Sequence, residues 1–173
     1  YSGDCPPVQS PLQAAYLFNF AGAPWLAQKW LREILSGYGE HHSPLSSVLC
    51  YPEQSAALYA LGAIGLFQTD GGTSARPCYE IGSPLFDRIT IRLDGKYYPG
   101  GKFVIEAGNN SSGNIYVRKA ALNGKELTGP WFPHTDLSSG GNLVLRMGSR
   151  PDKTWGIRPE NAPPSMSSGM TEA

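Results

Sequence analysis

The first third of the chain carries apolar residues at helical spacing, in segments that proline opens and glycine closes. One segment, residues 12–21, precedes Gly22, and a second, residues 25–35, precedes Ser36-Gly37. Proline suits a first helical turn because its missing N–H is not needed there, and glycine suits the residue after the last turn. The second segment gathers its apolar side chains at helical spacing: Trp25, Leu26, Trp30, Leu31, Ile34 and Leu35. We therefore expect two helices over these ranges.

A third helical segment, residues 52–67, begins at a proline and has small or apolar residues on most sides. We expect it to be buried for that reason. After a Gly-rich linker the spacing changes from helical to alternating. Ile89, Ile91 and Leu93 alternate with Arg88, Thr90 and Arg92. This period of two predicts a strand, so a helical region ends here and a sheet region begins.

The later apolar runs are short, and turn signals separate them. We expect further strands at 103–105, 115–117 and 143–147, with Asp94-Gly95 and Asn123-Gly124 as turns. Asn123-Gly124 is the stronger signal, because a type I′ turn needs positive φ at both central residues. The inward-facing residues of this antiparallel region are expected to be Ile89, Ile91, Phe103, Ile105, Leu143 and Leu145.

These patterns divide the chain into four parts and predict an α+β fold. An extended lead-in (1–9) precedes the helical segment (10–69), the antiparallel β region (77–157) and a Pro/Ser-rich tail (158–173) that we expect to be loosely held.

Charge and length restrict the classes of function. The 173 residues include 14 basic and 14 acidic side chains, so the formal net charge is zero. Neutrality removes the usual electrostatic reason to expect nucleic acid or an anionic membrane as partner. No apolar run approaches the roughly 20 residues of a membrane-spanning helix. Because the chain starts without Met or a signal-like segment, we expect a cleaved chain or a piece of a longer protein.

The cysteines and the glycosylation sequons bear on whether the protein is secreted. Cys5, Cys50 and Cys78 lack metal-site spacing, so a zinc site is not expected. Cys50 and Cys78 flank the third helical segment and are a candidate disulfide, although three unpaired buried thiols fit the spacing as well. Asn109-Asn110-Ser111-Ser112 contains two overlapping glycosylation sequons, which favour a secreted or extracytoplasmic protein.

Several stretches share their order and spacing with one known family. They are residues 16–25, Gln28, 30–35, 63–67, 79–87, 114–117 and 121–124, His134 with Asp136, Gly140-Gly141, Met147-Gly148, Pro151 and Trp155-Gly156. Together they resemble the closing part of glycoside hydrolase family 92, the exo-acting α-mannosidases. The resemblance implies an N-terminal β-sandwich, an (α/α)6 barrel and closing strands. It also implies inverting hydrolysis of α-mannosides and a calcium ion at the domain interface, with ligands not identifiable here.

On this resemblance the three helical segments are the last helices of the barrel. Three helices do not close such a barrel, so we expect the rest of the same protein, or another chain, to cover them. A glycan is the further partner that the family implies.

The sequence departs from the family at its catalytic motifs. Where members carry paired histidines, this chain has Leu12-Gln13, and where they carry two acidic residues it has Cys50-Tyr51. An inverting glycosidase needs one carboxylic acid and one carboxylate, and neither thiol nor phenol is a good base near neutral pH. Glu53 is the nearby candidate base, with a first-turn Glu at a helix N-terminus as the competing interpretation. The candidate substrate-binding residues are Gln13, Tyr51 and Gln54.

Other polar and aromatic residues have a simpler interpretation. His41-His42 lack a third metal ligand, and His134 with Asp136 lie far in sequence from the expected site, so we interpret them as loop and structural residues. The aromatic side chains at helical spacing either pack in the core or stack on sugars: Tyr16, Phe18, Phe20, Trp25 and Trp30.

Three hypotheses remain, and whether the protein is an enzyme stays open among them. The first is a catalytically degenerate member that binds glycan or serves a structural role. The second is an active glycosidase of altered specificity whose catalytic groups lie mostly in a missing N-terminal portion. The third, an unrelated helical-plus-β domain, is disfavoured by the collinear match.

Overall fold

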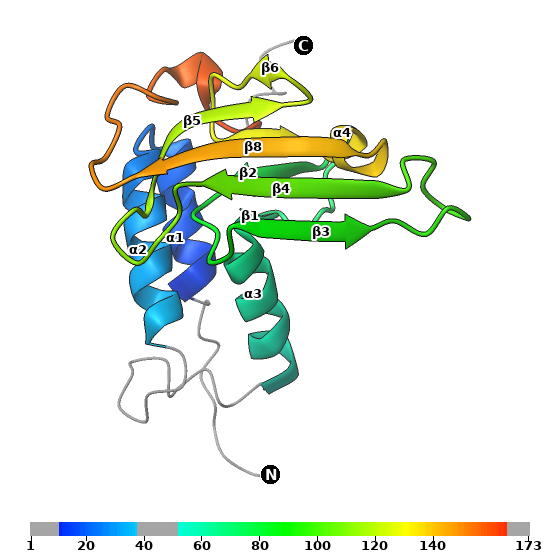
Figure 1. Cartoon of the computed structure of the whole chain (residues 1–173), viewed down its shortest axis with the longest axis horizontal. Coiled ribbons are helices and arrows are strands. Elements are labelled where there is room, and N and C mark those ends of the chain that lie inside the picture. The colour runs from blue at the N-terminus through cyan, green and yellow to red at the C-terminus, as the bar shows by residue number, and fades with distance from the viewer. Residues whose placement is uncertain (1–10, 38–51, 166–173) are drawn as a thin grey trace.

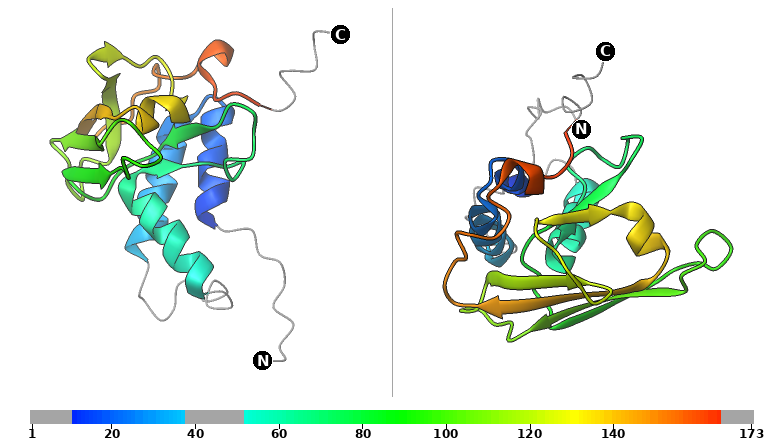
Figure 2. Two further views of the ribbon diagram at one scale, coloured as in Figure 1. Left: turned by 90° about the vertical axis from the view of Figure 1, so that its right-hand side faces the viewer. Right: turned by 90° about the horizontal axis from the view of Figure 1, so that it is seen from above.

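The computed structural model describes residues 11–37 and 52–165. Three helices lie beside two β-sheets (Figure 1): α1 (Pro11–Phe20), α2 (Pro24–Ser36) and α3 (Pro52–Ile64). Seen from above, α1 and α2 lie at one end of the molecule, and the strands form two layers that continue away from them (Figure 2). This mixed arrangement confirms the α+β class.

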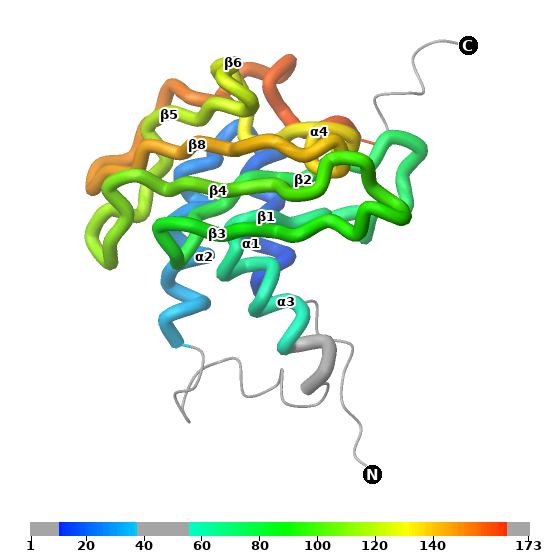
Figure 3. The backbone as a smooth tube through the Cα atoms, turned by 45° about the vertical axis from the view of Figure 1, so that its right-hand side comes forward, coloured from blue at the N-terminus to red at the C-terminus, as the bar shows by residue number. Residues whose placement is uncertain are grey.

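The described strands form one small and one large sheet. The small sheet has the order β1 (Leu66–Phe67), β2 (Cys78–Ile81), β7 (Trp131–Pro133). The large sheet has the order β3 (Arg88–Arg92), β4 (Lys102–Gly108), β8 (Gly141–Gly148), β5 (Tyr116–Leu122), β6 (Lys125–Glu126). The long strands β4 and β8 run side by side through the centre of the large sheet (Figure 3).

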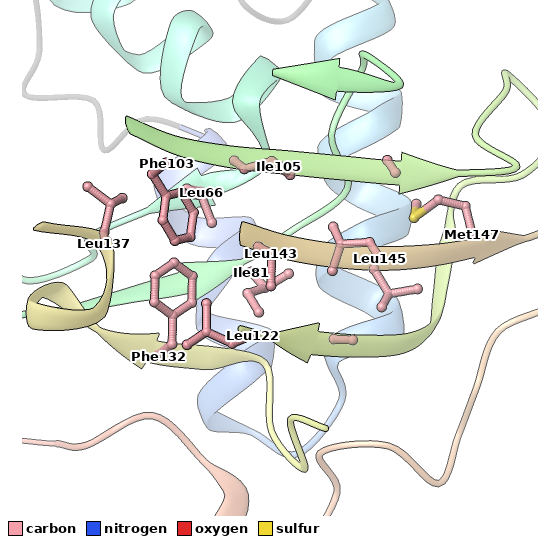
Figure 4. Close-up of a cluster of buried hydrophobic side chains, with 13 residues drawn as sticks. Leu66, Ile81, Phe103, Ile105, Leu122, Phe132, Leu137, Leu143, Leu145 and Met147 are labelled. Carbon is pink, nitrogen blue, oxygen red and sulfur yellow. The ribbon is translucent and has the colours of Figure 1, made fainter. Parts of the chain in front are cut away.

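The main core lies between the two sheets. Phe103 on β4 stacks on Phe132 on β7, with ring centroids 5.8 Å apart, and Figure 4 shows both rings between the two layers. The inward residues predicted for β4 and β8 are fully buried: Phe103, Ile105, Leu143 and Leu145. Ile89 and Ile91 on the edge strand β3 are half-buried and pack against the same core. The predicted inward face is therefore confirmed.

One strand pairing differs from the prediction. β4 and β8 are parallel, with Phe103 opposite Gly141 and Ile105 opposite Leu143. Between them the chain passes through β5, β6, β7 and the short helix α4 (His134–Ser138) and re-enters the sheet in the same direction. The expectation of a wholly antiparallel region is wrong for this pair, because a long connection of this kind permits parallel pairing.

Local turn signals predicted other features well. The β5–β6 hairpin turns at Asn123 and Gly124, whose φ angles are 49° and 80°, as a type I′ turn requires. α1 and α2 span the expected segments to within a residue or two, and Gly22 has a positive φ of 67°.

The third helix is shorter and more exposed than expected. It ends at Ile64, and Leu66–Phe67 form β1 instead of continuing the helix. Gly65 ends it with a φ of +79°, and a Cβ there would lie 2.7 Å from the backbone N of Pro84. Ala56, Ala57, Ala60 and Leu61 are exposed, so the expectation of burial on most sides is wrong over this part.

The tail begins in close contact with the body. Trp131 Nε1 donates to the carbonyl of Asn161 at 3.2 Å, next to the 3-10 turn η2 (Pro159–Asn161), and Pro163 is buried. Asn161 and Pro163 therefore contact the rest of the fold, and the loosely held tail stays a prediction.

Candidate functional site

The predicted substrate-binding residue Gln13 lies in the first turn of α1. Its Nε2 donates to the carbonyl of Thr69, just after β1, at 3.1 Å, and the side chain is half-buried. The amide therefore ties the start of α1 to the chain that leaves the small sheet.

The other predicted site residues lie at or before the first turn of α3. Glu53 and Gln54 belong to the helix, but their side chains, with the whole of Tyr51, lie outside the described residues. The start of α1 meets α3 near its other end, since a Cβ on Gly62 would lie 3.2 Å from Leu12 Cδ2. Eight residues of helix separate positions 54 and 62, a rise of about 12 Å. The structure therefore does not bring Gln13 next to the first turn of α3.

The carboxylate that the structure places in a special environment is Glu80 on β2, which the sequence analysis did not single out. The residue is 2% exposed and accepts hydrogen bonds from Thr69 N at 3.1 Å and Thr69 Oγ1 at 2.6 Å. Burial raises the pKa of this carboxyl to about 7, against the opposing effect of the Thr69 hydrogen bonds. It is a pKa suited to proton transfer near neutral pH.

Tyr16 lies near enough to this carboxylate to be affected by its charge. The phenol is fully buried and stacks on Phe67 with centroids 4.8 Å apart. Burial and, after it, the charge of Glu80 raise the pKa of Tyr16. Its hydroxyl has no hydrogen-bond partner among the described residues, and a Cβ on Gly82 would lie 2.7 Å from it. Tyr16 is therefore core, and the Glu80 carboxylate lies inside the fold with no described opening to a substrate.

A signal for Glu80 was present in the sequence but ambiguous. The run Cys78-Tyr-Glu-Ile81 alternates weakly, and β2 is buried on both sides, since only Tyr79 is half-exposed. A central strand of a small sheet between layers buries both faces, so alternation alone does not say which way a lone Glu points.

His134 and Asp136 lie on α4. The ring nitrogen Nδ1 of His134 lies 3.2 Å from the Tyr79 hydroxyl, and its ring is 6.3 Å from that of Tyr98. Burial raises the pKa of Tyr79. This small polar and aromatic cluster joins α4 to β2, in agreement with the structural interpretation of His134.

The described residues contain no group of three or more His, Cys, Asp or Glu side chains that could hold a metal ion. They therefore do not fit a calcium site of protein carboxylates, and no calcium-dependent step is assigned to them. Cys78 is a free buried cysteine rather than the disulfide partner considered for Cys50, and burial raises the pKa of its thiol to about 12. Cys5, Cys50, His41 and His42 lie outside the described residues.

Two open cavities lie at the end of the large sheet where β4 and β8 end. The larger, about 590 Å³, is lined by Gly108, Asn109, Arg118, Lys119, Arg146, Met147 and Asp152. The smaller, about 370 Å³, is lined by Asp87, Arg88, Glu106, Ala107, Gly108, Asn109 and Asn110. Hydrogen bonds from Thr154 hold the pKa of Asp152 below its ordinary value. In the larger cavity Asp152 is the one lining carboxylate, so that cavity lacks the carboxylate pair that glycoside hydrolysis requires. Two carboxylates, Asp87 and Glu106, line the smaller cavity, where Glu106 forms an ion pair with Arg88.

Comparison with known proteins places these features in context. The family model described as the glycosyl hydrolase family 92 catalytic domain matches residues 9–149. A curated protein described as an uncharacterized secreted glycosidase, from Arthroderma benhamiae, is 27% identical over 162 residues. That match covers 91% of this chain and 20% of the fungal protein.

Solved structures match nine-tenths of this chain. A family GH92 inverting mannosidase from Bacteroides thetaiotaomicron is 36% identical with a TM-score of 0.73. A family GH92 α-mannosidase from the same organism is 27% identical with a TM-score of 0.75, and each match covers 90% of this chain and 20% of the bacterial one. This chain therefore spans about a fifth of the length of the relatives it matches.

Proposed function

Because this chain belongs to glycosyl hydrolase family 92, we propose that it is the C-terminal portion of a secreted family 92 protein that keeps the mannosidase scaffold without the catalytic groups. Its role is then to bind glycan or to stabilise the assembled protein. The observation that carries this proposal is a retained scaffold around substituted motifs. Cys50-Tyr51 and Leu12-Gln13 replace the acidic pair and the paired histidines that the family resemblance implies.

The chemistry of the described residues supports this loss. Inverting hydrolysis needs an acid and a base about 6.5–9.5 Å apart on opposite sides of the sugar. Among the described residues the one buried carboxylate is Glu80, and it lies inside the fold against Thr69 rather than in an open cavity. Glu53 in the first turn of α3 is the remaining candidate base of this chain.

The helices support the idea that further protein covers them. Leu17, Trp30 and Leu61 on α1, α2 and α3 are 53%, 42% and 37% exposed. In the proposal these exposed apolar side chains are covered by another part of the protein. In the proposal these helices are the last ones of an (α/α)6 barrel, and the rest of the same protein or a second chain completes the ring.

Two observations support secretion in this proposal. The fungal relative is described as secreted, and this chain carries two overlapping sequons. No helix in the described ranges has the length and apolar character to span a membrane. Calcium at the domain interface belongs to the proposal as a property of the whole protein, with ligands outside the described residues.

The test is an assay of the full-length protein with calcium and α-1,2-mannobiose. We expect no turnover, with glycan binding measurable by calorimetry. Turnover that Glu53→Gln abolishes and Glu33→Gln preserves would contradict the proposal and support the glycosidase of altered specificity. Glu33 is a matched control because it is an exposed helical glutamate on α2. Turnover that survives Glu53→Gln would contradict it too and would place the base elsewhere in the protein.

A further inference from the structure

The two overlapping sequons occupy a turn whose two asparagines have different surroundings. Asn109 and Asn110 follow β4 directly, with Ser111 and Ser112 completing the Asn-x-Ser pattern of each. We propose that Asn109, and not Asn110, carries an N-linked glycan in the folded protein. The inference rests on the secretion that the proposed function includes, and not on its catalytic part.

Asn109 has an exposed side chain with room around it. Its Nδ2 makes one described hydrogen bond, to the carbonyl of Met147 at 3.2 Å, and Asn109 lines both cavities at this end of the large sheet. Asn109 has a φ of +63°, a left-handed conformation that asparagine tolerates better than most residues.

The chemistry of attachment is compatible with this contact. The donor is an oligosaccharide linked to a lipid diphosphate. Nδ2 loses one proton and bonds to C1 of the first sugar, while the bond from C1 to the diphosphate oxygen breaks and the diphosphate leaves. Because an amide nitrogen has two hydrogens, the second N–H remains to donate to Met147. The 590 Å³ cavity beside it is lined by Arg118, Lys119 and Arg146, whose N–H groups suit sugar hydroxyls.

Both polar atoms of the Asn110 side-chain amide make hydrogen bonds. Its Oδ1 accepts from Arg32 Nη2, and its Nδ2 donates to the carbonyl of Pro84 at 3.3 Å. Asn110 is half-buried, and Arg32 also donates to Ser83 Oγ at 2.9 Å and to Pro84. Burial lowers the pKa of the Arg32 guanidinium, because it removes water from around the charge. The hydrogen bonds to these acceptors replace those that water would make to the guanidinium.

A sugar on Asn110 would therefore separate α2 from the loop after β2. Ser83 extends the same network, since its Oγ donates to the carbonyl of Ile115 at 2.6 Å. The hydrogen bonds of Asn110 to Arg32 and Pro84 can form only when its side chain carries no sugar. The fold thus distinguishes two sequons that are equivalent in sequence.

The overlap gives a matched pair of variants in the full-length protein secreted from yeast. Ser111→Ala removes only the Asn109 sequon, and Ser112→Ala removes only the Asn110 sequon. Ser111→Thr keeps both sequons and controls for the change at a position whose Oγ accepts from Asn114 N at 3.0 Å. The measurement is mass spectrometry of the tryptic peptide that spans residues 103–118, before and after enzymatic deglycosylation in ¹⁸O water, which marks the modified asparagine.

We expect a glycan at Asn109 in the natural protein, in Ser112→Ala and in Ser111→Thr, and its loss in Ser111→Ala. A ¹⁸O mark at position 110, a glycan that survives Ser111→Ala, or an unmodified peptide from the secreted natural protein would each overturn the proposal. The mannobiose assay is measured separately, so failure of the catalytic proposal leaves this result interpretable.

Discussion

The sheet region and the helical region of this chain differ in the size of the apolar core that each contains. Between the sheets, Phe103, Ile105 and Leu143 are fully buried among residues of the same region. On the helices, a smaller cluster around Leu12 and Leu31 is buried, while apolar side chains on the outer faces remain exposed. The sheet region thus contains the larger core, and in the proposed function the rest of the protein covers the exposed apolar side chains of the helices.

The largest effect is expected in the sheet core. Phe103→Ala removes a fully buried ring that stacks on Phe132, and it should lower the free energy of unfolding by about 3–5 kcal/mol through lost burial and a residual cavity. Urea unfolding of the full-length protein measures it. Tyr97→Ala, at a residue that is 67% exposed, is the control and should change stability by about 0.5 kcal/mol or less. Equal effects at both positions would break the contrast.

The next effect is expected at the junction of the two regions. Gly65→Ala places a Cβ against Pro84 at a φ of +79°, and it should cost about 3 kcal/mol through backbone strain and the clash. Gly95→Ala is the matched control, because a Cβ at Gly95 meets nothing within 4 Å. Thermal unfolding of both variants measures the difference. A loss for Gly65→Ala no greater than for Gly95→Ala would show that this junction tolerates movement.

A smaller effect that varies with pH is expected at Glu80. Burial raises the pKa of its carboxyl from 4.5 to about 7 in the folded state. As pH rises from about 4.5 to 7, the unfolded chain releases this proton first, so stability falls across that window and the loss is complete above it. Glu80→Gln keeps an acceptor for Thr69 without the charge. It should therefore be more stable than the natural protein at pH 8, by about 1–3 kcal/mol.

The measurement is the unfolding free energy at pH 4, 6 and 8. Glu126→Gln is the control, because Glu126 is exposed on β6, and it should leave the pH dependence unchanged. A Glu80→Gln protein that keeps the full fall of stability between pH 4.5 and 7 would place the titrating group elsewhere.

The smallest effect is expected on the helices. Leu61→Ala in the full-length protein should cost about 1–2 kcal/mol, because in the proposal the exposed part of this side chain is covered by the rest of the barrel. Phe86→Ala, at a residue that is 55% exposed next to the sheet region, is the control and should be nearly neutral. If urea unfolding shows that neither variant changes the free energy of unfolding, Leu61 is not covered by the rest of the protein. That result would contradict the proposed cover of the helices.

The sequence by itself determined the local structure. Proline and glycine fixed the limits of α1 and α2, the alternation of Ile89 and Ile91 with arginines predicted β3, and Asn123-Gly124 predicted the hairpin. Each of these features depends on the φ preference or side-chain period of a few consecutive residues. The collinear motifs likewise predicted the family that the comparisons confirm.

Only the tertiary structure decided how distant segments combine. The parallel pairing of β4 with β8 and the hydrogen bond from Arg32 to Asn110 each join residues far apart in the sequence. The burial of Glu80 likewise depends on how β2 packs in the fold. Leu66–Phe67 leave the helical pattern because β2 offers them a strand partner. Local preferences carry no information about which partner is near, so the pairing and the environment of each polar group come from the packed fold.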